Sequence, residues 1–255
     1  MTIVQMLSYH FMQRALIVGV LVSLCAALLG VSLVLKRYSM IGDGLSHVGF
    51  GALAIASALH LAPLAVAVPV VIVTAVLLLR LSQSSRVKGD AMIAIISSSA
   101  LAIGVICVSL TTGMNTEVSS YMFGSILSLA VLALFVLFYP RLFAVTFDES
   151  FSKATGTRTE LYNTLLAVLT AVTVVLGMRM MGALLISSLI IFPALSAMRI
   201  CRSFKAVVLC AAGISVGCFV LGTVASFFLE TPTGASIVVA DLICFGICSL
   251  LGSRD

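Results

Sequence analysis

The sequence predicts an all-α polytopic membrane protein with about nine transmembrane helices, on the evidence of its hydrophobicity, its few charges and its long apolar runs. Of 255 residues, 62% are hydrophobic and only 9% are charged, against about 25% charged in an ordinary soluble domain. Because a soluble chain of this size needs far more polar surface, lipid must solvate most of this one. We expect one transmembrane domain over residues 1–255, with no basic domain for nucleic acid and no secreted disulfide framework.

Nine segments approach the roughly 20 apolar residues that span a bilayer when the chain is cut at clusters of charge, proline and glycine. The stretch before them, MTIVQMLSYHFMQRAL, has no basic region before an apolar run and no cleavage site, and we expect a retained interfacial helix there. The second and third segments are separated only by Ala62 and Pro63 and could form one broken unit. The nine segments are 16–35, 40–61, 64–81, 91–110, 125–143, 161–178, 180–198, 206–229 and 235–251.

The gaps between these segments alternate in charge. One set of gaps holds twelve basic residues, whereas the other holds only Arg14 and Arg179. Since cytoplasmic loops are enriched in Lys and Arg, the N-terminus is expected outside and the C-terminus in the cytoplasm. The twelve are Lys36, Arg37, Arg80, Arg86, Lys88, Arg141, Lys153, Arg158, Arg199, Arg202, Lys205 and Arg254.

Few ionisable residues interrupt the apolar segments, and each costs roughly 2.5 to 3.5 kcal/mol near the bilayer centre, so each is a functional candidate. Asp43 and His47 in the second segment are four residues apart and share one helix face. A carboxylate and an imidazole suit zinc, manganese or iron, although the pair could instead hydrogen-bond internally and to a neighbouring helix. Glycines nearby permit close approach, including that of a second copy: Gly42, Gly44, Gly49 and Gly51.

Other candidates carry less information. Asp241 in the ninth segment could belong to a pathway, be solvated at a vestibule or be capped by nearby hydroxyls. His10 and His60 are expected at the membrane interface, and Cys244 and Cys248, also four apart, are expected to pack as small apolar groups. The chain contains no HExxH and no GK[ST] motif, so a nucleotide-driven machine would need a separate ATPase.

Five motifs in order resemble the membrane permease subunit of the zinc, manganese and iron type of ABC importers. They are VLKRYSMIGDGLSHVGFG, KGDAMIAIISSSALAIGV, SSYMFGSIL, FDESFSKATG and MMGALLISSLIIFPALSAM, and the resemblance covers nearly the whole chain. Many manganese-type relatives have a proline after the histidine, whereas SHVGFG is more similar to the zinc-type permeases.

The resemblance implies that Asp43 and His47 bind metal in the translocation path and that segment 144–160 forms a cytoplasmic coupling helix against an ATPase. Within that segment the matching residues are Phe147, Asp148, Glu149, Phe151 and Gly156. The implied assembly is two permease copies, two ATP-binding cassette subunits and an extracytoplasmic metal-binding protein, in the bacterial cytoplasmic membrane. The permease would be a pore and not an enzyme, with Zn²⁺ or Mn²⁺ as cargo and no permanent cofactor.

Zinc is the expected cargo, with manganese second and iron also open. One Asp and one His cannot close a metal site, but two copies meeting along their second helices would supply two oxygens and two nitrogens, which suit tetrahedral zinc. Three other functions compete: an ion-coupled secondary transporter in which Asp43 and His47 relay protons, an importer of an organic metal chelate, and an intramembrane metalloenzyme. The chelate importer would need a more polar path, and the enzyme more ligands.

Overall fold

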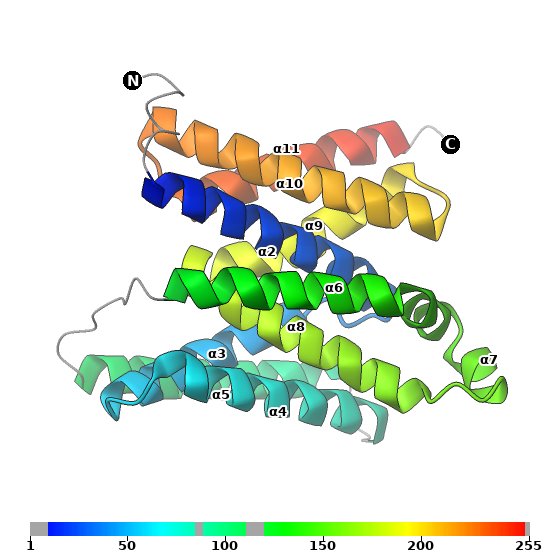
Figure 1. The fold of residues 1–255 in the computed structure, drawn as a ribbon, viewed down its shortest axis with the longest axis horizontal. Coiled ribbons are helices and arrows are strands. Elements are labelled where there is room, and N and C mark those ends of the chain that lie inside the picture. The colour runs from blue at the N-terminus through cyan, green and yellow to red at the C-terminus, as the bar shows by residue number, and fades with distance from the viewer. Residues whose placement is uncertain (1–9, 85–88, 111–119, 253–255) are drawn as a thin grey trace.

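The computed structural model describes residues 10–84, 89–110 and 120–252, and within these ranges all regular secondary structure is helical (Figure 1). Nine helices have 18 residues or more, and the tenth, α7, has 6. The helices are α2 (His10–Leu35), α3 (Ile41–Ala58), α4 (Pro63–Ser84), α5 (Gly89–Leu110), α6 (Ser120–Phe147), α7 (Glu149–Ala154), α8 (Thr159–Met181), α9 (Ala183–Ile200), α10 (Phe204–Leu229) and α11 (Thr233–Gly252).

The long helices form a bundle in which α3, α4 and α5 lie on one side and α10 and α11 on the other (Figure 1). Helices α2, α6, α8 and α9 lie between these two groups, and α8 and α9 both contact α2 and α3. The short helix α7 lies beyond one end of the bundle, beside α6 and α8. Helix α3 is thus enclosed by α4, α5, α8 and α9.

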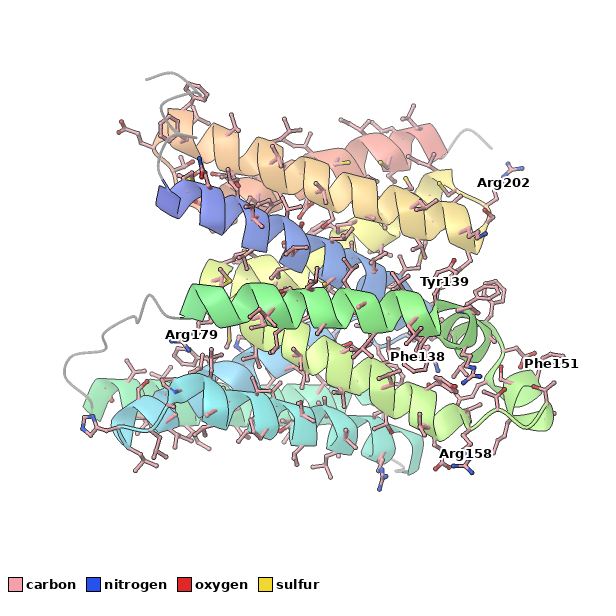
Figure 2. All side chains as sticks on the ribbon, viewed as in Figure 1. Phe138, Tyr139, Phe151, Arg158, Arg179 and Arg202 are labelled. Atoms are coloured by element: carbon pink, nitrogen blue, oxygen red, sulfur yellow. The ribbon has the colours of Figure 1, made fainter. Side chains whose placement is uncertain are left out.

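Each predicted segment corresponds to one long helix, which confirms the all-α polytopic prediction. Of the nine long helices in the described residues, eight are long and apolar enough to cross a membrane. The remaining long helix, α3, contains Asp43, His47 and four glycines and is not among these eight. Figure 2 shows Arg158 and Arg202 at one end of the bundle and Arg179 at the other, in keeping with the predicted segregation of charge. Which end faces the cytoplasm remains a prediction.

Several predicted boundaries were wrong for identifiable reasons. Helix α8 continues through Arg179 to Met181 and stops at Gly182, whose φ of 94° interrupts the helical path. Helix α6 continues beyond the predicted end at residue 143 and stops at Phe147. The Ala62–Pro63 gap separates two distinct helices, α3 and α4. The expected interfacial helix lies partly outside the described residues, while residues from His10 onward are continuous with α2.

Four helices end in the same way, with a residue of positive φ just beyond the helix and a backbone hydrogen bond five residues back. After α2, Arg37 has φ 61° and the Tyr38 N–H donates to the Leu33 carbonyl over 2.8 Å. After α7, Gly156 has φ 82° and the Thr157 N–H donates to the Ser152 carbonyl over 3.0 Å. These bonds satisfy helix-terminal carbonyls and fix the direction in which the chain leaves. His60 and Glu230 occupy the same position after α3 and α10.

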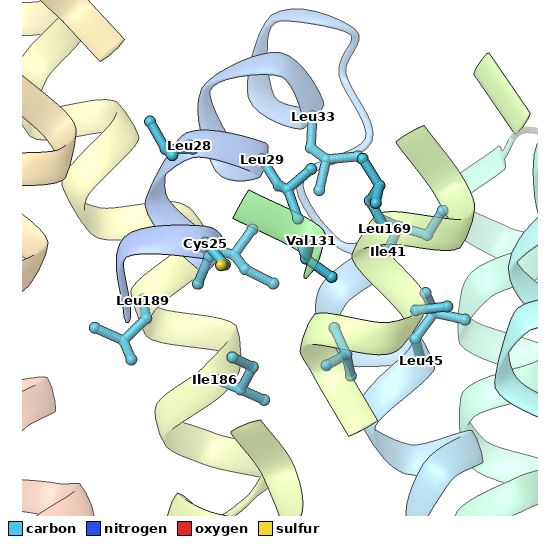
Figure 3. Close-up of a cluster of buried hydrophobic side chains, with 14 of the residues drawn as sticks. Cys25, Leu28, Leu29, Leu33, Ile41, Leu45, Val131, Leu169, Ile186 and Leu189 are labelled. Atoms are coloured by element: carbon cyan, nitrogen blue, oxygen red, sulfur yellow. The ribbon is translucent and has the colours of Figure 1, made fainter. Parts of the chain in front are cut away.

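The core lies where α2, α3, α8 and α9 converge, with α6 alongside (Figure 3). Leu29, Ile41, Leu45, Ile186 and Leu189 are among its fully buried side chains. The backbones of α2 and α9 come so close that a Cβ on Gly30 would lie 2.0 Å from the carbonyl oxygen of Ile190. Large apolar side chains are exposed on α6, α10 and α11, as lipid contact requires. They include Val136, Leu137, Leu209 and Leu250.

Candidate functional site

Asp43 and His47 lie on one face of α3, as their spacing predicts. Asp43 is in the first turn of the helix, and its Oδ2 is 3.7 Å from Nε2 of His47. That separation is too long for a hydrogen bond, so the direct bond of the packing alternative is not formed, whereas the bond to a neighbouring helix that this alternative also includes is present on Asp43. The Asp43 side chain is 40% exposed and that of His47 is 26% exposed, although α3 is enclosed by other helices. A small ion could therefore reach both side chains.

Ser187 of α9 also belongs to this group. Its hydroxyl donates to Oδ1 of Asp43 over 3.2 Å and lies 3.1 Å from the carbonyl oxygen of Ala183 on its own helix. One carboxylate oxygen of Asp43 is thus oriented by α9 while the other faces His47. Sequence reasoning missed Ser187, and the available signal was the hydroxyl pair inside the apolar motif ALLISSLIIFPALSAM.

The glycines of α3 pack within this chain, which corrects the expectation that they let two copies meet. A Cβ on Gly51 would lie 2.7 Å from the carbonyl oxygen of Ala100 in α5, so the two backbones touch there. Side chains of the same chain cover the others: Ile190 of α9 at Gly42, Ile93 of α5 at Gly44 and Met178 of α8 at Gly49. Asp43, His47 and Phe50 stay partly exposed and form a stripe along α3, and Leu53, Ile55, Ser57 and Ala58 are also partly or fully exposed toward its end.

The pair could supply two ligands to a metal ion. In the part of the chain that the structure describes, no three His, Cys, Asp or Glu side chains gather closely enough to hold an ion. A complete site on α3 would therefore need a ligand from outside this chain or from water.

Segment 144–160 divides into the end of α6, the helix α7 and a turn leading into α8. Asp148 caps α7, because its Oδ1 accepts a hydrogen bond from the Phe151 N–H over 2.8 Å. Phe151 is 65% exposed and points away from the bundle at its end (Figure 2). Phe147 is 69% exposed but also packs on Phe143 and on Phe204, with ring centroids 5.4 and 6.5 Å away.

The other two residues of this segment have structural partners. Gly156 ends α7 in the positive-φ position described above. Glu149 turns toward the bundle, where its carboxylate contacts Lys36 and Asn163. Phe151 and Phe147 thus offer the exposed apolar surface of this segment, whereas Asp148, Glu149 and Gly156 maintain its shape.

Asp241 lies in α11, which packs against α9 and α10. The side chain is fully buried, and neither carboxylate oxygen has a hydrogen-bond partner among the described residues. Both earlier expectations, solvation at a vestibule and capping by hydroxyls, are wrong for this structure. Cys244 and Cys248 lie on the same helix with their sulfur atoms 4.0 Å apart, and His60 is exposed at the end of α3.

Known proteins are similar to this chain in sequence and in fold over nearly its full length. Residues 8–252 match the family model described as the ABC 3 transport family. The zinc uptake membrane protein ZnuB of Haemophilus influenzae is 29% identical, with 93% of this chain and 96% of that protein covered. The manganese import permease ScaB of Streptococcus gordonii is 27% identical, with 97% and 93% covered.

Among solved structures, PsaBC from Streptococcus pneumoniae in complex with Fab matches with a TM-score of 0.85 and 26% identity, covering 97% of this chain and 95% of that one. Because the family model covers almost every described residue, this chain belongs to the ABC 3 transport family.

Proposed function

We propose that the chain is the membrane permease subunit of an ATP-driven importer of divalent transition metal ions, and that its cargo is zinc. The observation that carries the proposal is the accessible Asp43–His47 pair on α3, the one long helix of the described residues that is not among the eight apolar enough to cross a membrane. Relatives named for zinc and for manganese uptake support the metal class. Asp43 and His47 bind the ion as it passes, and Ser187 orients the Asp43 carboxylate.

ATP hydrolysis is assigned to separate subunits, because the sequence has no phosphate-binding GK[ST] loop. The exposed Phe147 and Phe151 at the end of the bundle are the proposed contact with an ATP-binding cassette subunit. Two permease copies, two such subunits and an extracytoplasmic metal-binding protein make up the proposed importer. Asp241 is a candidate for a second polar group along the path, since a buried carboxylate with no hydrogen-bond partner among the described residues is costly to retain for packing alone.

The zinc assignment rests on ligand chemistry. Two copies with their exposed α3 stripes facing each other would combine two Asp43 oxygens with two His47 nitrogens. Four such ligands suit tetrahedral zinc, whereas manganese more readily takes six ligands, mostly oxygen. Because the glycines of α3 are used within the chain, the two copies would approach through the stripe of Asp43, His47 and Phe50.

The test is transport by the purified chain in proteoliposomes supplied with the metal-binding protein, with and without its ATP-binding cassette subunit. Radioactive zinc should be taken up only when that subunit and ATP are both present. Uptake by the chain alone, driven by a proton gradient, would instead identify the ion-coupled secondary transporter. Uptake of a metal chelate with no transport of the free ion would identify the chelate importer.

A further inference from the structure

Lys36, Glu149 and Asn163 form a closed triangle of hydrogen bonds among three separate elements. Lys36 follows α2, Glu149 is the first residue of α7, and Asn163 lies in α8. The Lys36 Nζ donates to Oε2 of Glu149 over 3.1 Å and also to Oδ1 of Asn163. Asn163 completes the triangle by donating from Nδ2 to Oε1 of Glu149 over 2.9 Å. Both carboxylate oxygens of Glu149 are therefore occupied by inward partners.

The position of Lys36 links this triangle to the metal-binding helix. Only four residues separate it from Ile41, where α3 begins, and the turn between them is held by backbone hydrogen bonds. Arg37 takes the left-handed conformation, and the Ile41 N–H donates to the Tyr38 carbonyl over 3.0 Å. A displacement of Lys36 must consequently move the start of α3, the turn of helix that carries Asp43.

Helix α7 depends on the triangle for its attachment to the bundle. Six residues are too few for a helix to be stable alone, and Phe151 turns outward. On the inward side the buried Ser152 and the Glu149 carboxylate face the protein, and Lys36 is only 9% exposed. The Glu149 side chain is 42% exposed, so the shielded partner is Lys36, whose buried charge would be left unpaired if Glu149 moved away.

We propose that Lys36 is a positioning residue that couples α7 to the Asp43–His47 pair, so that movement of α7 imposed by the ATPase shifts the start of α3. This proposal rests on the proposed function, in which α7 contacts the ATPase. Glu149 then acts through Lys36 and Asn163, and not as a contact on the ATPase surface. Asn163 serves as the fixed point on α8, because its amide can donate to one partner and accept from the other.

The experiment measures metal transported per ATP hydrolysed in the reconstituted complex. Lys36→Met keeps the length and apolar stem of the side chain but removes the charge. We expect this variant to assemble with the ATPase and to hydrolyse ATP, while the transport-to-hydrolysis ratio falls at least about tenfold. The matched control is Lys205→Met, which removes a charge from an exposed position on α10. Its ratio should equal that of the wild type.

A charge exchange provides the second arm and covers the case in which Lys36→Met fails to fold. In the double variant Lys36→Glu with Glu149→Lys, the Asn163 amide can turn over and bond both partners again. The double variant should recover a larger ratio than either single variant. A wild-type ratio in Lys36→Met, or a double variant no better than the singles, would overturn the proposal. Absence of ATP-driven uptake in the wild-type complex would instead refute the proposed function itself.

Discussion

The Asp43 carboxylate has two different environments, since Ser187 donates to Oδ1 while Oδ2 faces His47. Replacing Asp43 by Asn or His47 by Ala should abolish metal uptake, because each removes one of the two ligands that α3 offers. Membrane insertion and assembly should persist, as both side chains are partly exposed and neither fills the core. Uptake of radioactive metal and immunoblots of the membrane fraction measure the two properties.

The controls for these variants are His60→Ala and Glu230→Gln, which change the same chemical groups at exposed helix ends. Both should transport at the wild-type rate. Near-normal uptake by Asp43→Asn and His47→Ala would mean that the pair only specifies helix packing.

Ser187 is expected to tune metal affinity without being a ligand. Ser187→Ala removes the hydrogen bond that orients Asp43, and partners of this kind typically contribute 10–100-fold in metal affinity. The half-saturating metal concentration should rise by about tenfold or more, with the maximal rate less affected. Ser188→Ala is the matched control, because Ser188 donates to the Leu185 carbonyl within its own helix. Equal half-saturating metal concentrations in the two variants would show that Ser187 is not part of the site.

The sequence predicted Asp43 and His47 because ionisable residues are so scarce in the apolar segments that each one stands out. It could not predict their partner. Ser187 is 144 residues from Asp43, and Lys36 is 127 residues from Asn163, so only the packing of the bundle brings each pair together. Hydroxyl and amide residues are also common in transmembrane helices, so the hydroxyl pair that includes Ser187 is a weak signal that names no partner.

At the scale of elements, the two exposed phenylalanines near α7 should differ in their effects. Phe151→Ala removes an outward side chain with no aromatic partner among the described residues, so it should weaken ATPase binding and leave permease stability unchanged. Phe147→Ala should lower both, because Phe147 also packs on Phe143 and Phe204. Co-purification of the ATPase and thermal unfolding in detergent separate these effects.

Phe228→Ala is the matched control, since Phe228 is similarly exposed at the far end of α10. It should leave ATPase binding unchanged. Full ATPase binding by Phe151→Ala would exclude α7 as the docking element. A combined replacement of Asp148, Glu149 and Phe151 by Ala would be harder to interpret. It would remove a helix cap, the contact with Lys36 and part of the docking surface at the same time.

Helix number and order could be predicted because apolar length and charged gaps are local properties of the chain. Helix ends were harder, since they depend on backbone conformation. Gly182 ends α8 through its positive φ, although Arg179 three residues earlier appeared to be the natural boundary. The face of α3 that remains open also needed the structure, because glycines fit both a close neighbour in the same chain and a second copy.

At the scale of the whole molecule, the proposed function gives one chain two metal ligands on α3, so it predicts that a second copy completes the site. A mixed complex containing one wild-type and one His47→Ala permease should lose most of its transport, because the four-ligand shell would lack one nitrogen. Two differently tagged copies purified in sequence give this complex. Half of the wild-type rate would show that each copy transports independently.

The choice of metal follows from the same shell of two oxygens and two nitrogens. Zinc accepts four such ligands in a tetrahedron, and partial exposure of both side chains leaves room for the ion to exchange instead of being trapped. A strain deleted for its own zinc and manganese importers and complemented with this transporter should therefore grow when zinc is limiting and fail when manganese is limiting. The Asp43→Asn transporter serves as the inactive control in both media. Rescue under manganese limitation alone would refute zinc as the cargo and would indicate a shell completed by additional oxygen ligands, water among them.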